Sequence, residues 1–382
     1  MADIKVVVTP MQRATAFCPV SVALPVPLDE VAGQVLFDEQ RGAYVPCQAE
    51  TQGEGCRLHW ILDSAAAGQQ RRFTLREGKA PAAGPGVQLT ERECRIEIKI
   101  GGQLVTNYHY QQITRPVLYP VIGPFGHGVT RAFPMEDLPD DHKDHKHHRS
   151  IWNAWGDVNG SNNWSEEEGH GTVAHRAFDA RGGGPVFGII ATRNDWLDKS
   201  GKKLMEDRLV YRFYNLPSSM RLIETDVTFL ATEGDVRFGD TKEGGVCSVR
   251  VAAPMEADRG GRIENAFGGV NEQETWGKRA HWCDYSGVVG GHKVGITVFD
   301  HPRSFRYPTY WHVRNYGLMT ANPFGLSYFL NDKEADGSYV LAKGKSLAFR
   351  YAIFVHAGDA SEGGVRNRYL DWVYPPTAVV EE

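Results

Sequence analysis

Four histidines lie close together in the run from Asp141 to Trp155, which reads DHKDHKHHRSIWNAW. Imidazole is the commonest metal ligand in proteins and the side chain that titrates nearest neutral pH. If this run is an extended strand, His145 and His147 share one side and His148 lies on the other. Such a pair could supply two metal ligands, or a general acid and base, once a third group arrives from elsewhere. The alternative is a solvated loop, because lysines and aspartates are interleaved with the histidines.

The sequence becomes apolar directly after Arg149, with Ile151, Trp152 and Trp155 in the next six positions. This change places the histidine cluster at the edge of a core strand. We therefore expect His145, His147 and His148 to take part in catalysis. His145 and His147 could also hold a divalent metal ion, and mixed nitrogen and oxygen ligands would suit zinc, manganese, iron or nickel. Without a metal, the same histidines would act as acid and base.

A second stretch with chemical potential is GDTKEGGVCSVR, residues 239–250. Glu243 could serve as an acid, a base or a metal ligand, with Lys242 or Arg250 tuning its pKa. A Lys-Glu-Gly-Gly run is also typical of a hairpin turn.

A third stretch, residues 300–325, is rich in histidine, arginine and tyrosine. If residues 310–316 form a strand, Tyr310, His312, Arg314 and Tyr316 lie on one face. Two cations and two tyrosines on one side suit a wet, concave binding surface, with His312 as the catalytic partner of the histidine cluster. A solvated sheet face is the alternative.

The elements that must position these residues are short strands. Apolar and charged residues alternate cleanly in residues 94–100, and the same period recurs in residues 209–213, 223–229 and 349–355. The first 78 residues carry five short apolar runs, at residues 4–8, 20–26, 34–37, 44–48 and 58–62. We predict an all-β protein, with an immunoglobulin-like sandwich in residues 1–78 and a large β-sandwich in residues 79–382. The Gly/Pro/Ala-rich residues 76–86 would link the two.

Composition excludes several classes of function. The chain has 382 residues and a net charge of -5, which argues against nucleic-acid or membrane-surface partners. No run approaches the roughly 18 apolar residues of a membrane span. The six cysteines show no CxxC spacing and no secretory signal is visible, so we expect free thiols and a cytoplasmic location. The motifs of P-loop, Rossmann and GxSxG enzymes are missing as well.

Five runs together resemble a bacterial family of unknown function that is commonly labelled "methane oxygenase PmoA": RPVLYPVIGP, DHKHHRSIW, FGDTKEGGVCSVRVA, WGKRAHWCDYSG and WHVRNYGLMTANPFG. The resemblance spans roughly residues 110–356. It implies a large sandwich of the galactose-mutarotase type and a role close to sugar metabolism. Carried over by position, it points to Asp144, His145, His147, His148, Arg149, Lys242, Glu243, His312, Arg314 and Asn322. The oxygenase in the label would need a copper or iron site, and its namesake spans the membrane, which this chain does not.

These observations predict a carbohydrate-active enzyme that works by acid and base chemistry, as an epimerase, lyase or glycosidase does. The catalytic candidates are His145, His147, His148, Glu243 and His312. The candidates for binding a sugar or oligosaccharide are Arg149, Trp152, Lys242, Arg250, Arg314, Tyr316 and Asn322. A second hypothesis is a non-catalytic carbohydrate-binding or scaffold protein. The sequence leaves the oligomeric state open.

Overall fold

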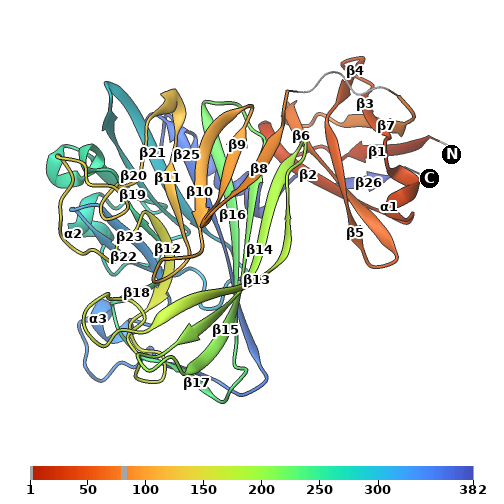
Figure 1. Cartoon of the computed structure of the whole chain (residues 1–382). Helices are drawn as coiled ribbons and strands as arrows, with labels where there is room; N and C mark the ends of the chain where they lie inside the picture. Colours follow the sequence, from red (N-terminus) through yellow and green to blue (C-terminus); the bar gives the residue numbers. More distant parts are fainter. Residues whose placement is uncertain (1–2, 79–83, 382) are drawn as a thin grey trace.

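A computed structural model describes residues 3–78 and 84–381 of the chain. Its regular structure is almost entirely antiparallel β-sheet, arranged as a small sandwich and a large sandwich (Figure 1). The prediction of an all-β protein with a small sandwich followed by a large one is therefore confirmed. The proposed linker, residues 76–86, includes residues 79–83, which lie outside the described part of the chain. The boundary at residue 78 remains a prediction.

The small sandwich packs a five-stranded sheet on a three-stranded sheet. The five-stranded sheet has the order β26 (Ala378–Val380), β1 (Ile4–Val8), β7 (Arg71–Arg76), β3 (Val35–Asp38) and β4 (Ala43–Val45). The three-stranded sheet has the order β2 (Thr15–Leu24), β6 (Gly55–Ala65) and β5 (Cys47–Gln52). The short helix α1 (Leu28–Val31) lies between β2 and β3 along the chain. Strand β26 comes from the far end of the sequence and pairs with β1, so both ends of the chain meet in this sandwich (Figure 1).

The large sandwich consists of two eight-stranded sheets. The first has the order β22 (Tyr310–Arg314), β23 (Leu318–Asn322), β18 (Gly244–Arg250), β12 (Ile151–Trp155), β11 (Val117–Val121), β10 (Gln103–His109), β9 (Arg95–Ile100) and β8 (Val87–Arg92). The second has the order β13 (Thr172–Gly182), β14 (Phe187–Leu197), β15 (Lys203–Tyr214), β16 (Met220–Leu230), β25 (Ser346–Ala357), β21 (His292–Asp300), β20 (Trp282–Val289) and β19 (Arg262–Asn265). We call these the site sheet and the back sheet.

Smaller elements complete the large sandwich. A two-stranded ribbon pairs β17 (Val236–Phe238) with β24 (Tyr339–Leu341). The helices are α2 (Asn271–Thr275), α3 (Leu326–Leu330) and α4 (Val365–Val373), and three-residue 3-10 turns occur at Pro124–Gly126, Ala253–Met255 and Ala257–Arg259. In the described part of the chain, no helix combines the length and apolar character that a membrane crossing requires.

The alternating sequence pattern explains how the two large sheets pack. In β9, Ile96, Ile98 and Ile100 are buried, whereas the residues between them are half-buried or exposed. The inward residues of both sheets form one continuous core, in which Ile98 and Val249 of the site sheet and Ile353 of the back sheet take part. All six cysteines are free, as the sequence predicts.

A core substitution tests this packing. Ile353 is fully buried in the middle of the back sheet, and we expect Ile353→Ala to lower the free energy of unfolding by about 2–5 kcal/mol, since it leaves a cavity. Val340 is 54% exposed, and Val340→Ala should change stability by no more than about 0.5 kcal/mol. Urea unfolding measures both variants. Equal stabilities would contradict the assigned core.

Candidate functional site

The histidine cluster is a turn and not the extended strand that its HxH spacing predicts. His145 has a left-handed backbone with φ 40°, and the amide of His148 donates to the carbonyl of His145 at 2.9 Å. The regular strand β12 begins only at Ile151. The alternation of sides is therefore wrong for this run, and we call residues 141–149 the histidine loop. The prediction that a core strand follows the cluster is confirmed.

Buried arginines hold the histidine loop in place. Arg131 is fully buried, and its Nη1 donates to the carbonyls of His142 (3.2 Å) and Asp144 (3.0 Å) and to the Asp144 carboxylate (2.7 Å). Its Nη2 donates to the carbonyls of His145 (2.8 Å) and His148 (3.0 Å). A guanidinium group carries five N–H donors in a fixed fork, and here that fork fixes the path of the loop.

Two further arginines complete this support. Arg250 is fully buried on β18 and donates to the Asp144 carboxylate at 3.1 Å and to Nδ1 of His148 at 3.2 Å. Arg115 donates to the carbonyl of His147 at 3.2 Å. Because Nδ1 of His148 accepts a hydrogen bond from Arg250, the neutral ring of His148 carries its own proton on Nε2.

The histidine loop packs against one face of the site sheet. The strand pairing places Trp152, Ser248, Thr320 and His312 in one row across β12, β18, β23 and β22. The residues next to this row (Ile151, Val249, Met319 and Val313) belong to the main core, so the row lies on the opposite face of the site sheet. Ser248 and Thr320 join it through a hydroxyl–hydroxyl contact of 2.6 Å.

Aromatic rings form a continuous stack above this row. Tyr316 stacks on His145 with 5.3 Å between ring centroids, His145 on His148 at 4.7 Å, and His148 on Trp152 at 5.3 Å. Trp164 contacts the rings of His147 and His148 edge-on. The stack joins the histidine loop, β12 and the turn between β22 and β23 into one unit.

His147 is the least satisfied polar group in this unit. Its side chain is 8% exposed, and neither ring nitrogen has a hydrogen-bond partner among residues 3–78 and 84–381. Burial lowers its pKa to about 4, so the ring is neutral at pH 7. A buried polar atom without a partner carries a desolvation cost, so a ligand group that supplied a partner would bind favourably there.

Glu243 interacts electrostatically with His147 and with His312, a buried histidine on β22. Nδ1 of His312 donates to the carbonyl of Lys242 at 2.7 Å, which leaves the lone pair on Nε2. Burial lowers the pKa of His312 to about 4. The carboxylate of Glu243 forms an ion pair with Lys242 and interacts electrostatically with both His312 and His147. These interactions outweigh the effect of burial and lower the pKa of Glu243.

Local backbone requirements place Glu243 there. It precedes β18, and the run after it is not a hairpin turn but the start of that strand. A Cβ atom at Gly244 would lie 2.4 Å from the ring of Trp155, and one at Gly245 would lie 1.5 Å from Oγ1 of Thr320. Only glycine fits at both positions, because the neighbouring strands approach closely.

Asn322 fixes the same turn and has no atom left for a substrate. Its amide nitrogen donates to the carbonyls of Thr241, Lys242 and Gly244. Its oxygen accepts from the amides of Phe324 and Gly325. The structure thus gives Asn322 a positioning role in place of the predicted contact with substrate.

Most of the other predicted binding residues are also held by protein partners. Arg149 forms a two-pronged ion pair with Glu166, at 2.7 and 2.6 Å, and Arg314 pairs with Glu272 at 2.9 Å. Trp152 is buried beneath His148. Of the predicted residues, His145, Lys242, Glu243, Arg314 and Tyr316 are partly or fully exposed, and His147, His148 and His312 are buried. We call the exposed group the rim of the site.

The residues present do not form the predicted metal site. Nδ1 of His145 is taken by Asp144 at 2.5 Å, and the ring centroids of His145 and His147 are 5.8 Å apart and nearly perpendicular. In residues 3–78 and 84–381, no three His, Cys, Asp or Glu side chains are grouped so that they could hold a metal ion. A catalytic zinc site needs three protein ligands, so we assign no step to a metal.

In the sequence analysis, no role is assigned to Arg115, Arg131, Trp164 or Glu166. Their partners explain why. Arg131 and Arg115 bind backbone carbonyls of a loop, which leave no pattern in the sequence. One signal in the sequence is that both arginines, Arg115 and Arg131, lie in the Gly/Pro-rich residues 114–134 that precede the histidines.

The fold and site together define an all-β protein of two sandwiches with a histidine-rich site on one sheet of the large sandwich. Residues 95–369 match the model of a "Family of unknown function (DUF6807)", and the chain belongs to this family. No curated protein matches the sequence.

Two solved structures show a weak similarity to this chain. One is a protein in glycosyl hydrolase family 38 from Enterococcus faecalis, with 11% identity and a TM-score of 0.46; the match covers 100% of this chain and 47% of that one. The chain thus spans about half the length of that protein. The other is a GalM/aldose epimerase homologue from C. elegans, with 8% identity and a TM-score of 0.29, covering 72% of this chain and 99% of that one. At these scores, neither likeness bears on activity.

The support of the histidine loop can be tested at Arg131. We expect Arg131→Ala to lower the free energy of unfolding by about 3–5 kcal/mol, because it leaves Asp144 and four carbonyls without their donor. Arg131→Lys should not restore stability, since one ammonium group cannot reach all of these acceptors. Urea unfolding gives the values, and Arg208→Ala, an exposed residue in the middle of β15, is the matched control. An Arg131→Ala protein as stable as this control would refute the role.

Glu166 provides a pH test of the same support. Burial alone would raise the pKa of Glu166, but the hydrogen bond from Arg149 and the charge of Arg115 lower it to about 2. An unfolded glutamate titrates near pH 4.3, so the stabilisation is complete above that pH and is lost as the pH falls towards about 2. Glu166→Gln should remove this acid-sensitive part, whereas the exposed Glu167→Gln should not. Unfolding curves between neutral and acidic pH decide, and identical pH profiles for wild type and Glu166→Gln would contradict the ion pair.

Proposed function

We propose that the chain is a carbohydrate-active enzyme that transfers a proton to or from a sugar at the histidine site. The observation that carries the proposal is His147, a buried neutral imidazole whose two nitrogens lack partners within the described ranges, beside Glu243. A neutral imidazole can donate a proton from one nitrogen and accept one at the other, as general acid–base catalysis requires.

The roles follow from the hydrogen bonds. Nε2 of His312 keeps its lone pair, because Nδ1 donates to the carbonyl of Lys242, so His312 can accept a proton. Glu243 interacts electrostatically with both His312 and His147. Its negative charge would stabilise the protonated form of either imidazole ring. Lys242, paired with Glu243, could stabilise negative charge that develops on a substrate oxygen.

Proton transfer, as in epimerisation or β-elimination, suits this arrangement better than hydrolysis. Glycosidases generally need two carboxylates across the bond that is cleaved. Glu243 is available, but Glu166 is held by ion pairs with Arg149 and Arg115. Sugar is the proposed substrate class because flat rings such as Tyr316 and His145 adjoin hydrogen-bonding charges at the rim.

A second candidate function is non-catalytic sugar binding. The observation in its favour is the open rim, where His145 and Glu243 have side chains 42% and 44% exposed. A binding protein would hold a sugar at this rim without product formation. An oxygenase, which the label on the resembling family implies, would need copper or iron, and elemental analysis of the purified protein detects either.

The test is a screen of neutral and acidic sugars and glycosides for product formation, with and without divalent metal ions. We expect turnover of at least one sugar, and we expect His147→Ala and His312→Ala each to lower kcat/KM by about 100-fold or more. Lys143→Ala, an exposed change on the same loop, is the control. Binding without any product in the whole panel would favour the non-catalytic function instead.

The pH dependence of the reaction gives a separate prediction. Burial lowers the pKa of both His147 and His312 to about 4, so both rings stay neutral down to that pH. Activity should therefore hold from neutral pH down to about 4 and fall below it, when the rings become protonated. The acidic limb of kcat/KM against pH measures this. A limb near 6.5, the ordinary value for histidine, would contradict the assignment.

A further inference from the structure

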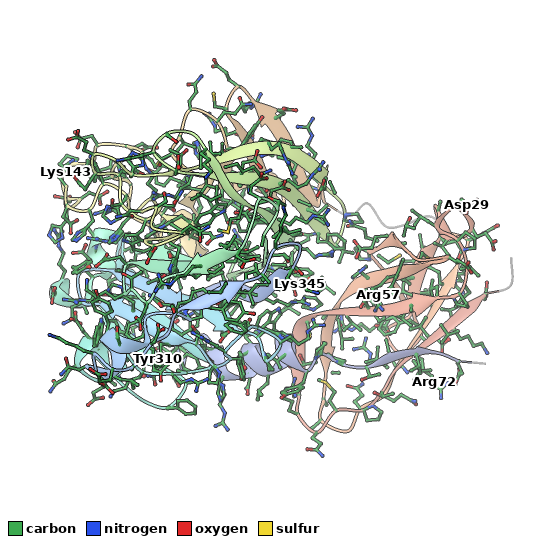
Figure 2. The ribbon with its side chains drawn as sticks, turned by 90° about the horizontal axis from the view of Figure 1, so that it is seen from below. Asp29, Arg57, Arg72, Lys143, Tyr310 and Lys345 are labelled. Atoms are coloured by element: carbon green, nitrogen blue, oxygen red, sulfur yellow. The ribbon has the colours of Figure 1, made fainter. Side chains whose placement is uncertain are left out.

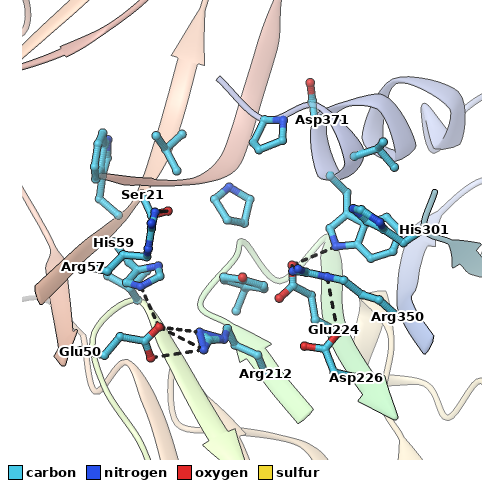
Figure 3. Close-up of a pocket in the computed structure, with 18 of the residues that line it drawn as sticks. Ser21, Glu50, Arg57, His59, Arg212, Glu224, Asp226, His301, Arg350 and Asp371 are labelled. Atoms are coloured by element: carbon cyan, nitrogen blue, oxygen red, sulfur yellow. Dashed lines mark hydrogen bonds and ion pairs between the residues drawn. The ribbon is translucent and has the colours of Figure 1, made fainter. Parts of the chain in front are cut away.

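A cavity of about 740 Å³ lies between the small sandwich and the outer face of the back sheet (Figure 3). Pockets of about 300–1,000 Å³ commonly hold small ligands, and interfaces between domains are frequent places for them. One wall comes from β2, β5 and β6, and the other from β15, β16, β25 and α4. None of its lining residues belongs to the histidine site. Figure 2 shows Lys143, on the histidine loop, at the end of the molecule far from Arg57.

Specific contacts fix the two walls relative to each other. Oε1 of Gln48 in β5 accepts hydrogen bonds from the amides of Val186 and Phe187, both at 3.2 Å. Asp371 in α4 accepts from Oγ1 of Thr15 at 2.7 Å and from Nη2 of Arg13 at 2.9 Å. Because these contacts join the small sandwich to the large one at several points, the cavity is preformed.

One cluster of charges spans the two sandwiches. Glu50 of the small sandwich contacts Arg212 of the back sheet at 3.3 Å and Nε2 of His59 at 3.0 Å. The hydrogen bond with His59 and the charge of Arg212 outweigh burial and lower the pKa of Glu50. The pair therefore stays ionised and offers both a donor and an acceptor at the edge of the cavity.

A second cluster lies across the cavity from the first (Figure 3). Glu224 and Asp226 are two residues apart on β16 and share one face. Arg350 lies beside both, with distances of 3.1 Å to Glu224 and 3.6 Å to Asp226. Glu224 also accepts a hydrogen bond from the indole of Trp372 at 2.9 Å, so its orientation is fixed.

The charges that line the cavity balance. Four arginines (Arg57, Arg212, Arg303 and Arg350) face four carboxylates (Glu50, Glu224, Asp226 and Asp371). Glu50 is paired with Arg212, Glu224 and Asp226 are paired with Arg350, and Asp371 is paired with Arg13. A neutral ligand with many hydroxyl groups can donate to the carboxylates and accept from the guanidinium groups at once.

Two of the arginines have donors to spare. Arg57 donates hydrogen bonds to the neutral side chains of Gln52 and Ser21, both at 3.0 Å. In residues 3–78 and 84–381, neither Arg57 nor Arg303 has a carboxylate oxygen within ion-pair distance. The rings of Tyr214, His301 and Trp372 also line the cavity and provide apolar surface. The combination of flat apolar rings with paired donors and acceptors matches the two kinds of surface that a sugar ring presents.

We propose that this cavity is a binding site for a neutral saccharide, held between the two sandwiches and separate from the histidine site. It does not depend on the function proposed for that site, because no residue is shared. A ligand that bridges both walls would also stabilise the contact between the sandwiches, since it binds only when they are folded together.

Calorimetric titration of the full chain tests the proposal, with glucose, galactose, xylose, maltose and cellobiose as neutral probes and galacturonate and inorganic phosphate as charged ones. We expect at least one neutral sugar to bind with a Kd in the millimolar range or tighter. Arg57→Ala and Arg303→Ala, one on each wall, should each weaken this binding by about tenfold. Arg208→Ala, outside both sites, should not weaken it.

His312→Ala separates the two sites. Binding that persists in His312→Ala and weakens in both cavity variants supports the proposal, whatever the catalytic screen shows. Three results would overturn it: no neutral sugar binds, only the charged probes bind, or binding is lost in His312→Ala and unchanged in Arg57→Ala and Arg303→Ala. Circular dichroism and unfolding curves show whether each variant is folded. Arg57 is half-buried and Arg303 is exposed, so the fold should tolerate the loss of either side chain.

Discussion

The histidine site depends on one interaction, the insertion of the Arg131 guanidinium into the histidine loop. In a loop rich in charged residues, the burial of apolar side chains does not drive packing against a sheet, and the backbone carbonyls would ordinarily face water. Arg131 supplies donors to four of these carbonyls and to Asp144. Asp144 in turn accepts from Arg250, which lies on β18 of the site sheet. One carboxylate between two buried arginines thus ties the loop to the sheet.

The chemistry of the imidazoles follows from this arrangement. Held close to buried cations and out of water, His147 and His148 lose protons more readily than free histidine does. The stack from Tyr316 to Trp152 then orients the rings without using all of their nitrogens. The result is a group of neutral histidines that retain donors and acceptors beside the ionised Glu243. The charged side chains Arg131, Arg250 and Asp144 hold the loop in place, and the neutral histidines remain available to a ligand.

Much of the fold could be predicted because its signals are local. Alternation in residues 94–100 matches β9, and residues 223–229 and 349–355 lie within β16 and β25. The shared face of His312 and Arg314 on β22 also follows from alternation alone. The histidine loop could not be predicted in this way, because its turn depends on the left-handed backbone at His145 and on Arg131, whose partners are carbonyls. The pairing of β26 with β1 likewise joins residues that are far apart in the sequence.

The most direct test of this account is a proton NMR titration of the histidine side chains. The account requires His147 and His312 to be neutral at physiological pH and predicts that both titrate near pH 4. Single His→Gln variants assign the two signals. Arg131→Ala should move the His147 signal towards the ordinary value near 6.5, because the loop loses its support and the ring becomes exposed to water. A wild-type His147 or His312 that titrates near 6.5 would contradict the account.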